Sequence, residues 1–387
     1  MKGITKETGD PMKRLIAIIL LIAMLPCAGM AELTEEYAHA RFRGRDIVGG
    51  AVIISRNGEI LFSSAYGYKN AGQNKPVTLD TCFRIASVTK LVSAVGLMKL
   101  IEEKGIDLDT PVKDIVGFQV VNPAFPDQPI TIRQVLSHTS GFVQTQYYFP
   151  NWEALKPDNR YFSKKTAPGT QYGYANLNGG LIGAMIEALS GQSVHDYMQE
   201  NVFLPLGINA AYHPGMLPDQ SDISDRLSKE GRTVQTANKA IARVDEYSDS
   251  CDPRAHTNIT SGNLWISANG LNRIISMLQM GGELDGVRIL QPETVQLMMQ
   301  PQHLIPDSSV TAESPYGLCM YREENMPGGT WYGHQGRYDG LSSNIYFQPD
   351  TGLTVTVIAN GYSPHAKDDI VTIARAFMEE AQQYAAE

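Results

Sequence analysis

Residues 48–66 read VGGAVIISRNGEILFSSAY. The apolar runs Val48–Ser55 and Ile60–Tyr66 are typical of β-strands, and Asn57-Gly58 between them is a preferred two-residue hairpin turn. The stretch therefore predicts two consecutive antiparallel strands. We expect this hairpin to be the N-terminal part of a larger sheet.

The C-terminal end of the chain repeats this pattern. Ser342–Phe347 and Leu353–Ile358 flank the turn Pro349–Gly352, and helical spacing follows over Lys367–Tyr384. The middle of the chain favours helices and loops. We predict an α+β fold in which N- and C-terminal strands build one antiparallel sheet, flanked by helices, with a mainly helical insertion at about residues 110–260. The active site is expected in the cleft between these two parts.

The N-terminus is typical of a targeting segment. Lys13 and Arg14 precede the apolar run Leu15–Leu25, and small residues follow. Because the run is shorter than the roughly 20 residues that span a bilayer, we interpret residues 1–31 as a signal peptide, with 1–11 a possible upstream extension. Residues 32–387 are then a single exported domain without a stable membrane span, secreted, periplasmic or associated with the cell envelope.

Composition excludes several classes of protein. The chain has 387 residues and a formal net charge of -9, which argues against a nucleic-acid partner. After signal cleavage Cys82, Cys251 and Cys319 remain, so at most one disulfide can form. No Cys and His cluster has zinc-ligand spacing, so we expect neither a metal nor a cofactor.

The first candidate catalytic element is Ser87-Val88-Thr89-Lys90, which opens a helical pattern that stops at Gly105. Three-residue spacing puts Ser87 and Lys90 on one helical face, where the amine can contact the hydroxyl. A lysine whose pKa is lowered by burial can activate a serine, which is otherwise a poor nucleophile. The alternative is a serine that caps the helix beside a solvated lysine.

A second element is Tyr174-Ala175-Asn176. Beside a cationic lysine the pKa of Tyr174 could be lowered, so that its hydroxyl acts as a general base. The amide of Asn176 could position Lys90 and bind a substrate carbonyl. The alternative is a packing tyrosine and a turn asparagine.

A third element is His334-Gln335-Gly336, just before the C-terminal hairpin. On an edge strand, Gly336 would let a substrate backbone approach closely. The main-chain N–H of Arg337 could join that of Ser87 in an oxyanion hole. A histidine on a strand can also be structural, which is the alternative for His334.

The three elements, in this order, resemble those of the serine beta-lactamase and penicillin-binding protein superfamily. Tyr-Ala-Asn is similar to the branch of class C beta-lactamases, D-alanyl-D-alanine carboxypeptidases and esterases. Further similar segments lie at Phe83–Ala86, Leu136–Gly141 and Phe203–Gly207, and the resemblance covers roughly Val48–Gly361. Within the second segment, His138 is interpreted as a structural turn residue.

The resemblance implies a secreted serine hydrolase that forms an acyl-enzyme on an amide or ester bond. It favours a D-alanyl-D-alanine carboxypeptidase or a related D-amino-acid peptidase acting on a small-molecule or peptide substrate, including peptidoglycan-derived ones. A carboxylesterase, a weak class C-like beta-lactamase, and a penicillin-binding sensor that is acylated without turnover are the alternatives.

The third element departs from the Lys-Thr-Gly of the superfamily. His334 should be mostly neutral near pH 7 and so bind a carboxylate less strongly than a lysine, which argues against efficient beta-lactam hydrolysis. If the side chain of Arg337 points into the site, it could replace the missing lysine. Otherwise Arg337 offers only its backbone N–H.

Overall fold

The computed structural model describes most of the chain after its N-terminal segment: residues 33–45, 47–72, 75–145, 151–155, 160–228, 230–243, 250–302, 316–361 and 371–385. The proposed signal peptide at 1–31 lies outside the described residues. Residues Glu35–Glu387 form one compact unit. Within the described residues, no helix has both the length and the apolar character needed to cross a membrane.

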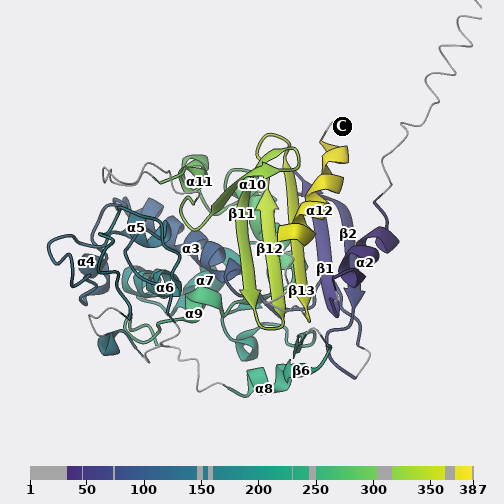
Figure 1. Ribbon diagram of the computed structural model, residues 1–387, viewed down its shortest axis with the longest axis horizontal. Helices are drawn as coiled ribbons and strands as arrows, with labels where there is room; N and C mark the ends of the chain where they lie inside the picture. The colour runs from purple at the N-terminus through teal and green to yellow at the C-terminus, as the bar shows by residue number, and fades with distance from the viewer. Residues whose placement is uncertain are drawn as a thin grey trace, which may run out of the picture. The chain divides into compact units, whose positions relative to one another are not determined.

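An antiparallel sheet of six strands, in the order β10-β11-β12-β13-β1-β2, is the centre of this unit (Figure 1). Its strands are β1 (Gly49–Arg56), β2 (Glu59–Gly67), β10 (Tyr321–Met326), β11 (Gly329–Tyr338), β12 (Leu341–Phe347) and β13 (Leu353–Asn360). β1 pairs with β13 along its whole length, from Gly49 opposite Asn360 to Arg56 opposite Leu353. This pairing joins the two ends of the chain and confirms the predicted sheet.

Both predicted hairpins form. Asn57 and Gly58 have φ values of 49° and 84°, so both turn residues are left-handed, as the tightest hairpin turn requires. Gly352, with φ of 75°, ends the turn between β12 and β13. The predicted C-terminal helix is α12 (Val371–Ala381), whose apolar face is buried.

Helices cover both faces of the sheet. Phe42 of α2 (Glu35–Arg43) packs at Gly50 on one face of β1. The amide oxygen of Asn272, from α10 (Ala268–Gln279), accepts a hydrogen bond from Ser55. Gly50 and Ser55 are an odd number of residues apart, so they face opposite sides of the strand. α2 and α10 therefore lie on opposite faces of the sheet.

A mainly helical region lies beside the sheet and contains α6 (Figure 1). Its helices are α4 (Val112–Val116), α5 (Ile132–Leu136), α6 (Asn176–Ser190), α7 (Val194–Met198) and α9 (Ile259–Gly262). α8 (Ala237–Ile241), which also falls in the predicted insertion, lies apart from them near β6 (Thr233–Gln235). α11 (Pro292–Met299) follows later in the chain. The described residues also form three small sheets. One consists of β3 (Phe83–Arg84), β7 (Trp265–Ile266) and β4 (Ala210–Ala211), the second of β5 (Arg226–Leu227) and β6, and the third of β8 (Glu283–Leu284) and β9 (Val287–Arg288).

α3 (Val88–Lys104) connects the helical region to the sheet, because it packs against α6 and α9 as well as against β11 and β12. Most of its side chains are buried, including those of Thr89, Lys90 and Ser93. The helix ends at Gly105, whose left-handed φ of 61° closes the last turn. The N-terminus of α3 is thereby fixed between the two parts of the molecule.

Candidate active site

Ser87 immediately precedes α3, and its side chain makes no capping hydrogen bond. Lys90, one turn later, is completely buried. The alternative of a capping serine beside a solvated lysine is therefore wrong. Ala86, directly before Ser87, has a φ of 49°, which is uncommon for a residue with a side chain and is often found at functional turns.

The amine of Lys90 contacts three oxygen atoms. Its Nζ lies 3.3 Å from Oγ of Ser87, 2.8 Å from Oδ1 of Asn176 and 2.7 Å from the carbonyl oxygen of Ser261. None of these partners is a carboxylate. Burial therefore dominates and lowers the pKa of Lys90 to about 7, so a large fraction of the amine is neutral at physiological pH.

Tyr174 lies over Lys90, with the amine 5.1 Å from the centroid of its ring. Its hydroxyl is buried and makes no hydrogen bond of normal geometry. Ser87 lies close enough to lower the pKa of this hydroxyl, but the effect of burial is larger. Burial raises the pKa of Tyr174. The expectation that Lys90 lowers this pKa is therefore wrong, and the resting phenol is protonated.

Asn176 is the first residue of α6 and holds three groups together. Its Oδ1 accepts from Lys90, its N–H donates to Oε1 of Gln144 at 2.9 Å, and its carbonyl oxygen accepts from Oγ of Ser261 at 2.6 Å. The structure thus brings the second element directly against the first.

His334 lies in β11 and is buried, with 1% of its surface exposed. Its Nδ1 is 2.6 Å from the carbonyl oxygen of Gln335 and its Nε2 is 2.8 Å from the hydroxyl of Tyr316. A carbonyl can only accept, so Nδ1 carries the hydrogen and Nε2 accepts from Tyr316. Burial, followed by the charge of Lys90, lowers the pKa of His334 to about 3. The imidazole is neutral, and both nitrogens are occupied by protein groups.

Gly336 faces the start of α3. A Cβ at this position would overlap the carbonyl oxygen of Ile85 and lie 3.1 Å from the backbone nitrogen of Ser87. The absence of a side chain thus permits a close approach of β11 to the nucleophile. Side chains alternate along a strand, so Arg337 leaves the opposite face of β11, where it is exposed.

β11 offers a free edge beside Ser87. β10 pairs with it only as far as Gly333, opposite Tyr321. Among the described strands, none pairs with residues 334–338 on that side. An extended substrate could therefore add to this edge.

Three residues of the site were not assigned a catalytic or binding role from the sequence. The ring of His138 stacks on that of Tyr174 at 4.3 Å between centroids, and its Nδ1 accepts from the N–H of Ala175 at 3.2 Å. His138 does occupy a turn, with φ of 56°, but it also orients Tyr174. Ser261 contacts Lys90, and Tyr316 contacts His334. Only His138 had a sequence signal, its place in a segment already identified as similar.

A cavity of about 240 Å³ opens beside Tyr174. Its lining includes Phe142, Val143, Gln144 and Tyr172, and no charged residue. It suits an uncharged group bound next to the phenol.

The part of the chain that the structure describes contains no group of three His, Cys, Asp or Glu side chains arranged to hold a metal ion. Cys82, Cys251 and Cys319 are all free thiols.

The sequence matches the family described as Beta-lactamase over residues 30–377. It is 32% identical over 186 residues to penicillin-binding protein 4* of Bacillus subtilis, covering 45% of this chain and 40% of that protein. It is 28% identical over 224 residues to the D-alanyl-D-alanine-carboxypeptidase/endopeptidase AmpH of Escherichia coli, covering 55% of this chain and 57% of that protein. The chain thus spans only about half the length of these curated relatives.

The fold is also similar to that of the octameric penicillin-binding protein homologue from Pyrococcus abyssi. The TM-score is 0.68 at 22% identity, covering 97% of this chain and 77% of that one. This likeness confirms the predicted fold class. Because the family match extends over most of the sequence and includes all three candidate elements, this chain belongs to the Beta-lactamase family.

Proposed function

We propose that this protein is an exported serine hydrolase that forms an acyl-enzyme on Ser87. One observation carries the proposal: a completely buried lysine with a pKa of about 7 lies 3.3 Å from the serine hydroxyl. An amine in this state can accept the serine proton at neutral pH.

In the first step the neutral amine of Lys90 takes the proton of Ser87 Oγ while that oxygen attacks the carbonyl carbon of the substrate. The carbonyl oxygen becomes negative, and the backbone N–H groups of Ser87 and Arg337 stabilise it. The close approach of Gly336 to the nitrogen of Ser87 supports this assignment.

In the second step the bond to the leaving group breaks. The leaving nitrogen or oxygen takes a proton from the protonated Tyr174, and Lys90 returns the serine proton to the phenol. Water then attacks the carbonyl carbon of the acyl-enzyme and gives a proton to Lys90 and Tyr174. The same two residues return a proton to Ser87 Oγ as the acyl group leaves. The raised pKa of Tyr174 supports a relay and not a phenolate base in the resting enzyme.

The substrate class that we favour is a peptide ending in D-alanine, as the name of the Escherichia coli relative suggests. The free edge of β11 would bind its backbone. A carboxylesterase is the second candidate, because His334 is neutral and the cavity beside Tyr174 contains no cation.

A panel of substrates tests this function. The purified enzyme would be assayed with a D-Ala-D-Ala peptide, D-aminoacyl amides, a p-nitrophenyl ester and a chromogenic cephalosporin. We expect turnover of the peptide or the ester and little of the cephalosporin. Labelling without deacylation would identify a sensor instead.

Labelling by an active-site serine probe tests the nucleophile. Ser87→Ala should abolish it while the fold is retained. Ser190→Ala is the matched control, because Ser190 lies at the far end of α6 and its hydroxyl binds the backbone of Ile186. Stoichiometric labelling of the Ser87 variant would show that another residue is acylated.

A further inference from the structure

His138 is a buried histidine that the proposed mechanism does not use. Only 1% of its surface is exposed, and its ring stacks on that of Tyr174, with the centroids 4.3 Å apart and the ring planes 26° apart. A titratable side chain in this place can either exchange a proton or hold the phenol in position. The hydrogen bonds of the imidazole decide between these two roles.

The backbone N–H of Ala175 fixes the state of the imidazole, because this group can only donate. It lies 3.2 Å from Nδ1 of His138, so Nδ1 is an acceptor and Nε2 carries the hydrogen. The side-chain nitrogen of Asn178 lies 2.9 Å from the same Nδ1 and is therefore a second donor. Protonation of Nδ1 would direct its hydrogen at two donors.

The electrostatic surroundings agree with this assignment. Burial, followed by the charge of Lys90, holds the pKa of His138 well below its usual value. His138 is therefore neutral and does not act as an acid or a base in the reaction.

Ser140 fixes the orientation of the Asn178 amide. Its Oγ donates to Oδ1 of Asn178 at 2.6 Å and accepts from the N–H of Phe142 at 3.3 Å. With Oδ1 held in this way, the NH2 group of Asn178 faces His138. Ser140 and Asn178 are each 1% exposed, so water does not compete for these hydrogen bonds. A line of buried contacts thus runs from Ser140 through Asn178 to the imidazole.

Packing holds the two stacked rings on their other sides. Nε2 of His138 is buried and has no hydrogen-bond partner among the residues that the structure describes. The ring meets that of Tyr316 at a steep angle, with 5.1 Å between centroids and 67° between planes. Since the hydroxyl of Tyr174 also lacks a hydrogen bond of normal geometry, its position depends on the groups that pack against its ring.

We infer that His138 is a positioning residue that holds the phenol of Tyr174 in place for proton transfer, and that Ser140 and Asn178 hold His138. It acts through Tyr174 and does not touch the reacting atoms. Proton transfer requires that the donor and acceptor lie within hydrogen-bond reach, so a small displacement of the phenol is costly. The inference rests on the proposed role of Tyr174 in the proton path.

His138→Asn tests this role, because it removes the ring and keeps an acceptor. Oδ1 of asparagine is bonded to Cγ, as Nδ1 of histidine is, so it can still accept from Ala175. Asparagine also tolerates the left-handed φ of 56° at this position. We expect kcat/KM to fall about tenfold or more, for any peptide or ester that the wild-type enzyme hydrolyses.

A double-mutant cycle with Tyr174→Phe distinguishes positioning from a general loss of structure. Phenylalanine keeps the ring but has no proton to place, so adding His138→Asn should lower kcat/KM by less than a further twofold or so. Ser140→Ala, a smaller change in the same line of contacts, should give a weaker loss that also disappears in Tyr174→Phe. Losses that multiply in the double variants, or no loss in either single variant, would overturn the inference.

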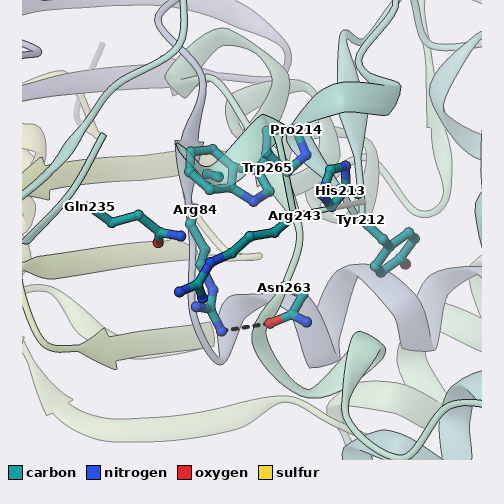
Figure 2. A pocket seen from close by; sticks show the side chains of 9 residues that line it. Arg84, Tyr212, His213, Pro214, Gln235, Arg243, Asn263 and Trp265 are labelled. Atoms are coloured by element: carbon teal, nitrogen blue, oxygen red, sulfur yellow. Dashed lines mark hydrogen bonds between the residues drawn. The ribbon is translucent and has the colours of Figure 1, made fainter. Parts of the chain in front are cut away.

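His213→Asn is the matched control. His213 is also buried, and its Nδ1 also accepts from a backbone N–H, that of Gly215 at 3.1 Å. It lines a different pocket, together with Arg84 and Trp265 (Figure 2). The control should change kcat/KM less than about twofold, because His213 does not position Tyr174. A loss equal to that of His138→Asn would show that the effect is not specific to His138, and would also overturn the inference.

A spectroscopic measurement separates this inference from the proposed function. If the wild-type enzyme hydrolyses no substrate and Ser87 is not labelled by a serine probe, the proposed function fails. The position of the phenol is then followed by NMR of the protein labelled with ¹³C at Cζ of tyrosine, in which Tyr174→Phe identifies the signal of Tyr174. His138→Asn should shift this signal and His213→Asn should not. An unchanged signal in His138→Asn rejects the inference.

Discussion

Ser87 lies between two groups of residues that differ in what they present to it. From α3, from the start of α6 and from the segment just before it, side chains converge near the serine: the amine of Lys90, the amide of Asn176 and the phenol of Tyr174. From β11, the backbone approaches it, because Gly336 has no side chain and both nitrogens of His334 bind protein groups. The comparison indicates that proton transfer depends on side chains and that substrate binding along β11 depends mainly on the strand edge.

The largest effects are expected on the helical side. Lys90→Ala and Tyr174→Phe should each lower the acylation rate at least about a hundredfold, because general acid–base groups typically contribute that much. The double variant should be little worse than either single one, since the two residues serve one proton path. Lys99→Ala, a partly exposed lysine of the same helix paired with Glu103, is the control. Additive losses would show that Lys90 and Tyr174 act independently.

The pH dependence follows from the lowered pKa of Lys90, about 7. Only the neutral amine can take the serine proton, so kcat/KM for a neutral ester should fall about tenfold per pH unit well below pH 7 and level off above it. His334, with a pKa of about 3, stays neutral throughout this window. A profile that still rises between pH 8 and pH 10 would show that burial does not lower the lysine pKa in this way.

On the β11 side, removal of the histidine should affect stability more than turnover. His334→Ala removes the hydrogen bond that the buried hydroxyl of Tyr316 donates to the imidazole, which should cost about 1–3 kcal/mol of unfolding free energy. We expect kcat/KM to fall less than about tenfold, which is smaller than a typical general acid–base contribution.

Tyr316→Phe removes the same hydrogen bond from its other end. The double variant should therefore be less destabilised than the sum of the two single ones. Chemical denaturation measures this directly. A loss of turnover in His334→Ala as large as that in Lys90→Ala would show that His334 takes part in catalysis.

The parts that could be predicted from the sequence depend on local patterns. Strand alternation around Asn57-Gly58 predicted the first hairpin, and three-residue spacing predicted that Ser87 and Lys90 meet. The pKa of Tyr174 could not be predicted, because it depends on how deeply the fold buries the ring and not on the neighbouring lysine alone. The pairing of Tyr316 with His334 likewise arises only when distant segments pack together.

The smallest effect is expected for the side chain of Arg337, and it separates a backbone role from a side-chain role on β11. Gly336 and Tyr338 face α3 and Arg84, so alternation directs Arg337 to the opposite, exposed face. Arg337→Ala keeps the backbone N–H and should therefore change kcat/KM less than about twofold, both for a peptide whose leaving group bears a carboxylate and for a neutral ester.

Arg322→Ala, on the neighbouring strand β10 and paired with Glu324, is the control for a general loss of surface charge. A selective loss of about ten- to a hundredfold on the peptide alone is what a charge-assisted contact would give. That result would mean that the side chain of Arg337 turns into the site when substrate binds and takes the place of the superfamily lysine, and β11 would then recognise its substrate through a side chain as well as through its edge.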